Sequence, residues 1–136
     1  MNGQIDWRAL FLSAAGRAAR GPSLLAVALL VAAAAVYESV VGNVLHWLTG
    51  WFVYPALIYA GACVLSKRLH DRGRSGWLAA PILFAIVACW PHPDSFLDFL
   101  FAAIVLWAVI DLGAMPGEAG TNRFGPNPLK AEPLAV

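Results

Sequence analysis

The sequence has little charge and few of the residues that build soluble active sites. Charged residues make up 12% of its 136 positions, with nine Lys and Arg against eight Asp and Glu. The two cysteines lie inside apolar stretches, so a disulfide framework is not indicated. The three histidines lie on separate segments of the chain, so a metal site is not indicated either. Walker, Rossmann and zinc signatures are absent from the sequence. We therefore expect no metal and no cofactor, and the apolar composition argues against nucleic-acid binding.

Apolar residues are what the sequence does contain. They make up 60% of it, and its mean hydropathy of +0.69 lies well outside the range of soluble globular domains. A chain of 136 residues has room for about four spans of about 20 residues each. The sequence therefore predicts an all-α integral membrane protein, a bundle of four transmembrane helices. The expected membrane domain covers residues 1–115, and an irregular cytoplasmic tail covers residues 116–136.

Turn-forming residues divide the apolar sequence into four expected spans. Their approximate ranges are 23–41, 50–66, 77–90 and 95–115. The third has only about 14 residues, which reach about 21 Å as a helix, against about 30 Å for the hydrocarbon core. We favour a complete span that borrows length from its flanks, and a re-entrant segment is the alternative.

The leader, residues 4–20, has the pattern of an amphipathic helix. Trp7, Leu10 and Phe11 begin an apolar stripe at helical spacing, while the arginines lie off that stripe. This pattern is typical of a helix that lies in the membrane interface. A cytoplasmic extension of the first span fits equally well. A signal peptide is disfavoured, because nothing after it resembles a secreted domain.

The positive charges are confined to three places. All nine Lys and Arg residues fall in the leader, in the central turn or in the tail, and none occurs in 21–66 or 75–122. Because cytoplasmic segments carry the excess of Lys and Arg, both termini and the central turn are expected in the cytoplasm. The expected location is a bacterial inner membrane, which the chain crosses several times.

The same three places carry recognisable motifs. GRAAR (16–20), RLHDRGRSGW (68–77) and GTNRFGPNP (120–128) occur in this order, with hydrophobic pairs between them. Together they resemble the bacterial inner-membrane family known as domain of unknown function 805. The resemblance implies a small multi-span membrane protein with its motifs on the cytoplasmic side, and it supplies no reaction and no catalytic residues. Gly21, Pro22 and Ser23 stand where the family commonly has aromatic or bulky residues.

The three motifs are expected to meet in one cytoplasmic lid. Asp71 lies within possible reach of arginines from the leader and the tail, and would join leader, turn and tail. Alternatively, surplus arginines and free amides at Ser75 would bind an anion, most naturally an anionic lipid head group. The candidate residues are Arg17, Arg20, Arg68, His70, Asp71, Arg72, Arg74, Ser75, Asn122 and Arg123.

Three acidic residues lie in or near the expected spans. Glu38 is costly in an apolar helix and is therefore a functional candidate, with pairing to a neighbouring helix as the preferred interpretation. If its helix continued, Glu38, Gly42 and His46 would follow one face like a proton relay. Asp98 fits a capping box with Ser95, and Asp111 is placed to pair with a cytoplasmic arginine.

The function that these patterns favour is that of a non-enzymatic accessory or scaffold protein. Its expected partners are membrane lipids, including anionic phospholipid, and further copies of itself or a larger membrane complex. The alternative is an oligomeric transporter or channel for ions or small solutes that uses Glu38. An enzyme is disfavoured, because His70 and Asp71 are adjacent on a helix and do not face each other.

Overall fold

The computed structural model describes residues 5–90 and 92–130, and this part of the chain is helical without strands. One isolated bridge joins Asn122 and Gly125 in the tail. The expected all-α class is therefore confirmed for these residues. The helices are α1 (Trp7–Leu12), α2 (Arg20–Val40), α3 (Asn43–Asp71), η1 (Gly76–Leu78), α4 (Ala79–Ala88), α5 (Phe96–Ala108) and η2 (Val109–Ala114).

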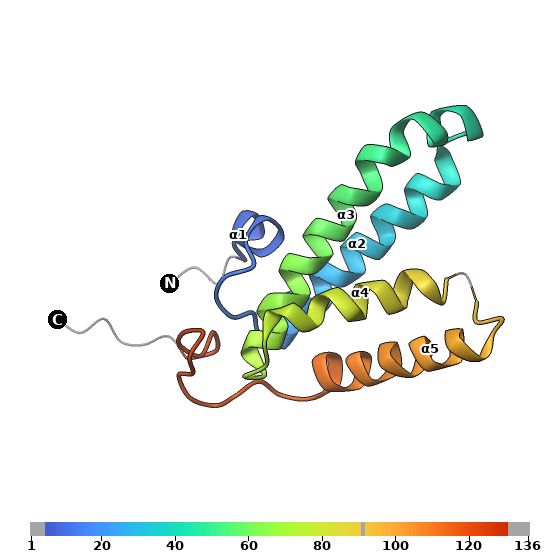
Figure 1. The fold of residues 1–136 in the computed structure, drawn as a ribbon. Coiled ribbons are helices and arrows are strands. Elements are labelled where there is room, and N and C mark those ends of the chain that lie inside the picture. Colours follow the sequence, from blue (N-terminus) through green and yellow to red (C-terminus); the bar gives the residue numbers. More distant parts are fainter. Residues whose placement is uncertain (1–4, 91, 131–136) are drawn as a thin grey trace.

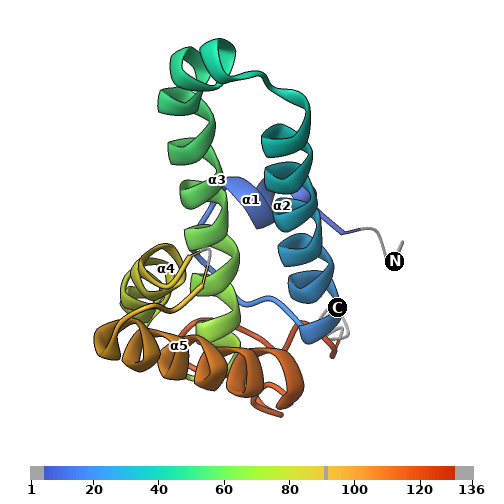
Figure 2. The ribbon, with the colours of Figure 1, turned by 90° about the vertical axis from the view of Figure 1, so that its right-hand side faces the viewer.

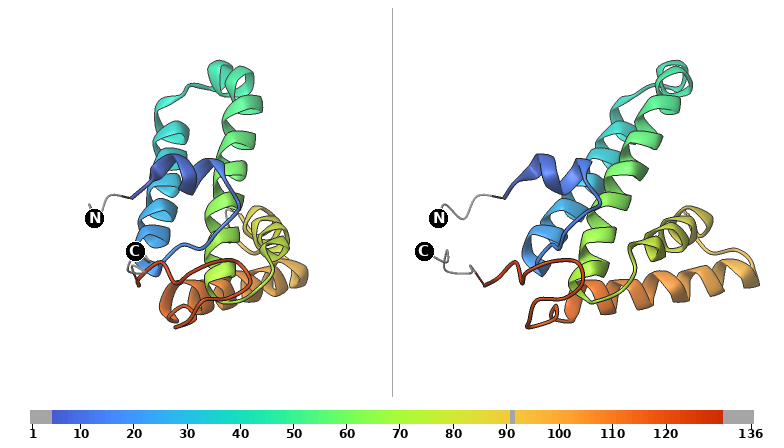
Figure 3. Two further views of the ribbon diagram at one scale, coloured as in Figure 1. Left: turned by 90° about the vertical axis from the view of Figure 1, so that its left-hand side faces the viewer. Right: turned by 60° about the vertical axis from the view of Figure 1, so that its left-hand side comes forward.

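The helices form two hairpins that diverge from a shared base. Helices α2 and α3 make a long antiparallel pair, and α4 and α5 make a second pair that points in another direction (Figures 1 and 2). The leader crosses the α2–α3 pair, and the tail wraps around the base of α3 (Figure 3). The end of the leader and the tail thus lie near the point where the hairpins meet (Figure 3).

Three helical segments are long and apolar enough to cross a membrane. They are Arg20–Val40, Asn43–Asp71 and Phe96–Ala114, with mean hydropathies of 2.0, 1.6 and 2.1. The helical segment Gly76–Ala88 is apolar but shorter. Three of the four expected spans therefore have the length and composition of a span, whereas the third, at 77–90, does not reach that length.

Helix α3 extends well beyond the expected range of 50–66. Residues 43–49, which lie between the first two expected spans, are themselves helical, and α3 includes Pro55 and continues to Asp71. Gly73 ends this region with φ = +68°, a conformation that glycine adopts without steric cost. The basic turn is therefore partly the last turn of a long helix.

The leader forms a shorter helix than the expected 4–20, whose first position lies outside the described residues. Asp6 caps α1, which ends at Leu12, and Ser13 is extended. Gly16, with φ = +89°, holds a turn that a continuous helix would not contain. Residues 13–19 instead run along α3, where the Ala18 amide donates to the Lys67 carbonyl at 3.2 Å. Contacts with α3 therefore outweigh the helical pattern of this segment.

The last helix begins and ends with identifiable signals. Ser95 and Asp98 form the expected capping box, with Ser95 Oγ accepting from the Asp98 amide at 3.3 Å. The final turn, η2, is a π-helix, a form that often marks a functional position. The tail follows from Met115 without a helix among residues 116–130, as expected for that part of 116–136.

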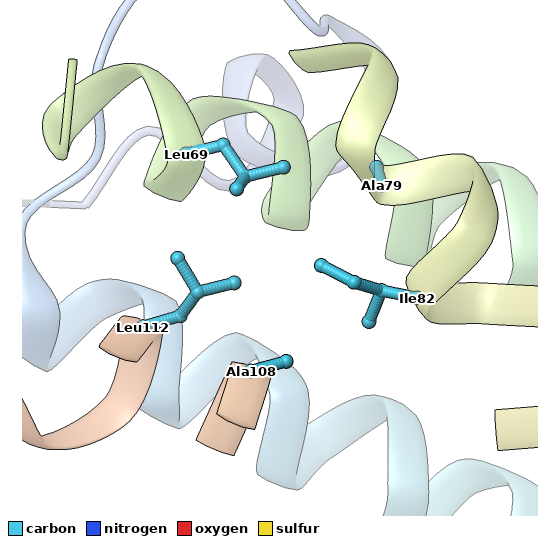
Figure 4. Packing of buried hydrophobic residues seen from close by; sticks show 5 residues of the cluster. All are labelled: Leu69, Ala79, Ile82, Ala108 and Leu112. Carbon is cyan, nitrogen blue, oxygen red and sulfur yellow. The ribbon is translucent and has the colours of Figure 1, made fainter. Parts of the chain in front are cut away.

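The core that joins the two hairpins is small. Side chains from α3, α4 and the end of the last helix meet at the base (Figure 4). They are Leu69, Ala79, Ile82, Ala108 and Leu112. A second cluster, made by Leu10, Ala18, Ala26 and Val64, fixes the leader to α2 and α3. These two clusters hold the basic turn between leader and tail.

Candidate functional site

One buried carboxylate joins the leader to the central turn. Asp71, the last residue of α3, is 3% exposed. Its Oδ1 accepts from Arg17 Nη2 at 3.0 Å and from Arg17 Nε at 3.1 Å, while its Oδ2 pairs with Arg68. The side chains of Arg17 and Arg68 are 1% and 2% exposed. Charge-assisted hydrogen bonds in such a buried place are strong and directional.

The same two arginines fix the tail. Arg17 donates to the carbonyls of Gly120 at 2.6 Å and Glu118 at 2.7 Å. Arg68 donates to the carbonyls of Leu112 at 2.7 Å and Met115 at 2.5 Å. Because both guanidinium groups are surrounded by protein acceptors, they act mainly as links between segments. We call Arg17, Arg68 and Asp71, with the tail residues they contact, the lid.

A second carboxylate ties the turn to the end of the last helix. Asp111 Oδ1 accepts from Arg72 at 2.9 Å, and its Oδ2 accepts from Arg74 at 3.1 Å. Arg72 also donates to the Pro116 carbonyl at 2.7 Å. Asp111 thus pairs with arginines of the central turn, as the sequence suggested.

His70 is held from three directions. Its Nδ1 lies 2.9 Å from the Gly16 carbonyl, and its ring stacks on Phe124 with centroids 3.8 Å apart. Asn122 Nδ2 donates to the His70 carbonyl at 2.9 Å and to Glu118 Oε2 at 2.6 Å. The tail motif therefore packs directly on the last turn of α3.

Some expected residues take other roles. Arg20 donates to the Ala114 carbonyl at 2.9 Å, and the Arg123 guanidinium lies over the Phe124 ring, 4.7 Å from its centroid. Their contacts are therefore with the end of the last helix and the tail, and not with Asp71. Ser75 stands at the N-cap position of η1, but its side chain makes no capping hydrogen bond.

Several contributors were missed by the sequence reasoning. Glu118 binds Asn122, and Lys67 Nζ donates to the Ala9 carbonyl at 2.5 Å. Gly117 is packed so closely that an added Cβ would lie 2.5 Å from Asp71 Cγ. The glycine and the glutamate occur together in the tail, but a non-periodic segment gives no indication of which residues contact α3.

The approach of Gly117 to Asp71 gives a testable prediction. Gly117→Ala should displace the tail from the lid and lower the free energy of unfolding by about 1–3 kcal/mol, the usual cost of overpacking. Gly120→Ala is the matched control, because nothing lies within 4 Å of a Cβ added there. Detergent-solubilised variants should be compared by SDS titration followed by circular dichroism. Equal unfolding of the two variants would contradict the close contact.

The acidic residues away from the lid have local partners. Glu38 accepts from the Tyr54 hydroxyl of α3 and lies 3.5 Å from His46 Nε2. Helix α2 ends at Val40, so Glu38 and His46 belong to different helices and the continuous relay face is wrong. Asp98 serves as the capping carboxylate. Among residues 5–90 and 92–130, no group of three or more His, Cys, Asp or Glu side chains is placed to hold a metal.

The charged residues of the site therefore hold separate segments of the chain together. Two carboxylates, Asp71 and Asp111, each pair with two arginines, which leaves two positive charges in excess while fixing the leader, the turn and the tail in one arrangement. Further positive charge remains on the surface, where Arg123 and Lys130 are exposed. These exposed groups, together with the exposed Arg8 and Arg20 of the leader and the partly exposed Arg74, are accessible to an external partner.

Comparisons with known proteins agree on one family. The model of the family described as "Protein of unknown function (DUF805)" matches residues 7–126, a range that includes the first two motifs and residues 120–126 of the third. The proteins called "Uncharacterized protein YiiR" from Escherichia coli K12 and O157:H7 are each 33% identical to the chain over 121 residues. The match covers 81% of this chain and 82% of each relative. No solved structure matches the chain significantly. With a resemblance over most of its length, the chain belongs to the DUF805 family of proteins of unknown function.

Proposed function

We propose that this protein is a multi-span inner-membrane accessory or scaffold protein without enzymatic activity. Both termini and the central turn lie in the cytoplasm, and the lid holds the tail so that its exposed Arg123 and Lys130 face a partner subunit or anionic lipid. The observation that carries the proposal is the Asp71 carboxylate, which joins the leader and the turn through Arg17 and Arg68.

The membrane placement rests on composition and charge. Three helical segments have the length and hydropathy of spans, and their exposed side chains are largely apolar. All lysines and arginines lie in the leader, turn and tail. The end of the leader, the turn and the tail meet at the base of the hairpins, whereas α1, which carries Arg8, crosses α2 and α3 above the base (Figure 3). The positive-inside rule assigns that base to the cytoplasm.

The scaffold role follows from how the lid uses its charges. Arg17 and Arg68 are buried and bound to protein acceptors, so they stiffen the surface rather than recruit a ligand. A rigid surface loses little conformational freedom when a partner binds. The exposed Arg123 and Lys130 then supply electrostatic attraction.

Charge reversal of the exposed residues tests this role. The double variant Arg123→Glu and Lys130→Glu should lose most of its partner or anionic lipid during mild purification, because like charges then face each other. Native mass spectrometry of protein extracted from membranes reports bound lipid, stoichiometry and partner subunits together. The folded state should persist, since neither side chain belongs to the Asp71 network.

The control is Asp94→Lys, at the opposite end of the second hairpin, where the Asp94 side chain is 76% exposed. This variant should retain the partner and the lipid. Unchanged recovery of both by the doubly reversed variant would refute the proposed role of the basic surface.

A further inference from the structure

A groove runs along α3 on the side that faces η1 and α4. Its volume is about 860 Å³, within the range of about 300–1,000 Å³ that is usual for ligand sites. Helix α3 forms its floor, η1 and α4 form one wall, and leader residues Ala14 and Ala15 contribute to the other. The groove is separate from the carboxylates of the lid, although His70 and Phe124 border it.

The greater part of the groove is apolar. Ile58 and Ala62 of α3 face Ala80 and Leu83 of α4 across it. Ile58 and His70, which mark its two ends on α3, are twelve positions apart, or about 18 Å along a helix. One leaflet of a bilayer contributes about 15 Å of hydrocarbon, half of the core thickness. The groove therefore has the depth of a single leaflet.

The end of the groove near the lid is polar and rigid. His70 Nδ1 faces the Gly16 carbonyl at 2.9 Å, and a carbonyl oxygen only accepts, so this nitrogen carries a hydrogen. In the neutral ring, Nε2 is then an acceptor. Stacking on Phe124 fixes the orientation of the ring.

Gly76 lets η1 pack directly against the polar side chains at this end of the groove. A Cβ added to Gly76 would lie 2.8 Å from His70 Nε2 and would overlap Ser66 Oγ. Both polar atoms therefore gather at one point of the groove wall, and Ser75 lines the groove beside them. An accepting imidazole nitrogen and two serine hydroxyls suit a ligand that brings hydroxyl donors.

We propose that this groove binds one phospholipid whose head group carries hydroxyls, with phosphatidylglycerol as the representative. One acyl chain lies along the apolar floor, and the glycerol hydroxyls reach His70 Nε2 and Ser66 Oγ. The proposal rests on the membrane placement inferred above and not on the scaffold role.

Filling the groove is the first test. Purified protein in mild detergent should retain one phosphatidylglycerol in native mass spectrometry, and Ala62→Trp should lose it because the indole occupies the floor. Ala33→Trp is the matched control, since Ala33 is exposed on α2 away from the groove. Equal lipid retention by Ala62→Trp and Ala33→Trp would overturn the proposal.

Removing one hydroxyl tests the choice of head group. Ser66→Ala should weaken phosphatidylglycerol binding about five-fold, the effect of about one hydrogen bond. Ser39→Ala, on the exposed surface of α2, should bind as the wild type does. Delipidated protein should be titrated with phosphatidylglycerol, phosphatidylethanolamine and a free fatty acid. Equal binding of all three lipids would overturn the head-group assignment.

The two proposals fail separately. The variant with Arg123 and Lys130 reversed should keep the groove lipid even when it loses its partner, because neither residue lines the groove. If that variant loses the same single lipid as Ala62→Trp, the lipid is held by surface charge and the groove assignment is wrong. Recovery of the wild type outside the membrane fraction would instead refute the membrane placement.

Discussion

Asp71→Asn is expected to lower the free energy of unfolding by about 3–5 kcal/mol, the cost of breaking a buried ion pair on one side. The asparagine keeps the shape of the side chain but removes its charge. The Arg17 and Arg68 side chains, 1% and 2% exposed, are then left without the carboxylate that neutralises them. The new amide hydrogens also face guanidinium donors instead of accepting from them.

The measurement is SDS or urea unfolding of the purified protein, followed by circular dichroism. Asp94→Asn is the control, because the Asp94 carboxylate is exposed and lies at the other end of α4 and α5. The double variant Arg17→Gln with Asp71→Asn should lose less free energy than the sum of its single variants, because the two residues act as one unit. If Asp71→Asn unfolds at the same denaturant concentration as Asp94→Asn, the carboxylate does not join the lid.

Ile82→Ala is expected to have the second largest effect, about 2–5 kcal/mol, because it opens a cavity in the core that joins the hairpins. Ile82 is 2% exposed and packs in one cluster with Leu69 and Leu112 (Figure 4). In lipid, burying an apolar side chain does not remove it from water, so Ile82→Ala loses dispersion contacts alone. We therefore expect a decrease in the free energy of unfolding in the lower part of this range.

The control for this variant is Ile86→Ala, one helical turn further along α4, where the side chain is 39% exposed. The two variants remove the same atoms from the same helix, so their difference reports the packing between hairpins. The free energy of unfolding of both should be measured in one detergent. Equal losses would show that the two hairpins are held together by the lid alone.

The lid was predictable as a meeting of three motifs, because the arginines and Asp71 occur only in segments that the charge pattern assigns to one side. The partners were predictable in part. Arg17 pairs with Asp71 as expected, whereas Arg20 and Arg123 bind a carbonyl and an aromatic ring. The sequence shows which arginines are near enough to contact Asp71 but not where their side chains point, so it does not tell which of the three forms the ion pair.

The sequence by itself determined the helical class, three of its four expected segments of membrane-spanning length and the capping box at Ser95. These features depend on the hydropathy and backbone preferences of residues that are close together in the sequence. The tertiary structure alone decided the short α1, the contact of Gly117 with Asp71 and the groove that ends at His70. Each of these depends on segments far apart in the chain, and their packing overrides the local pattern.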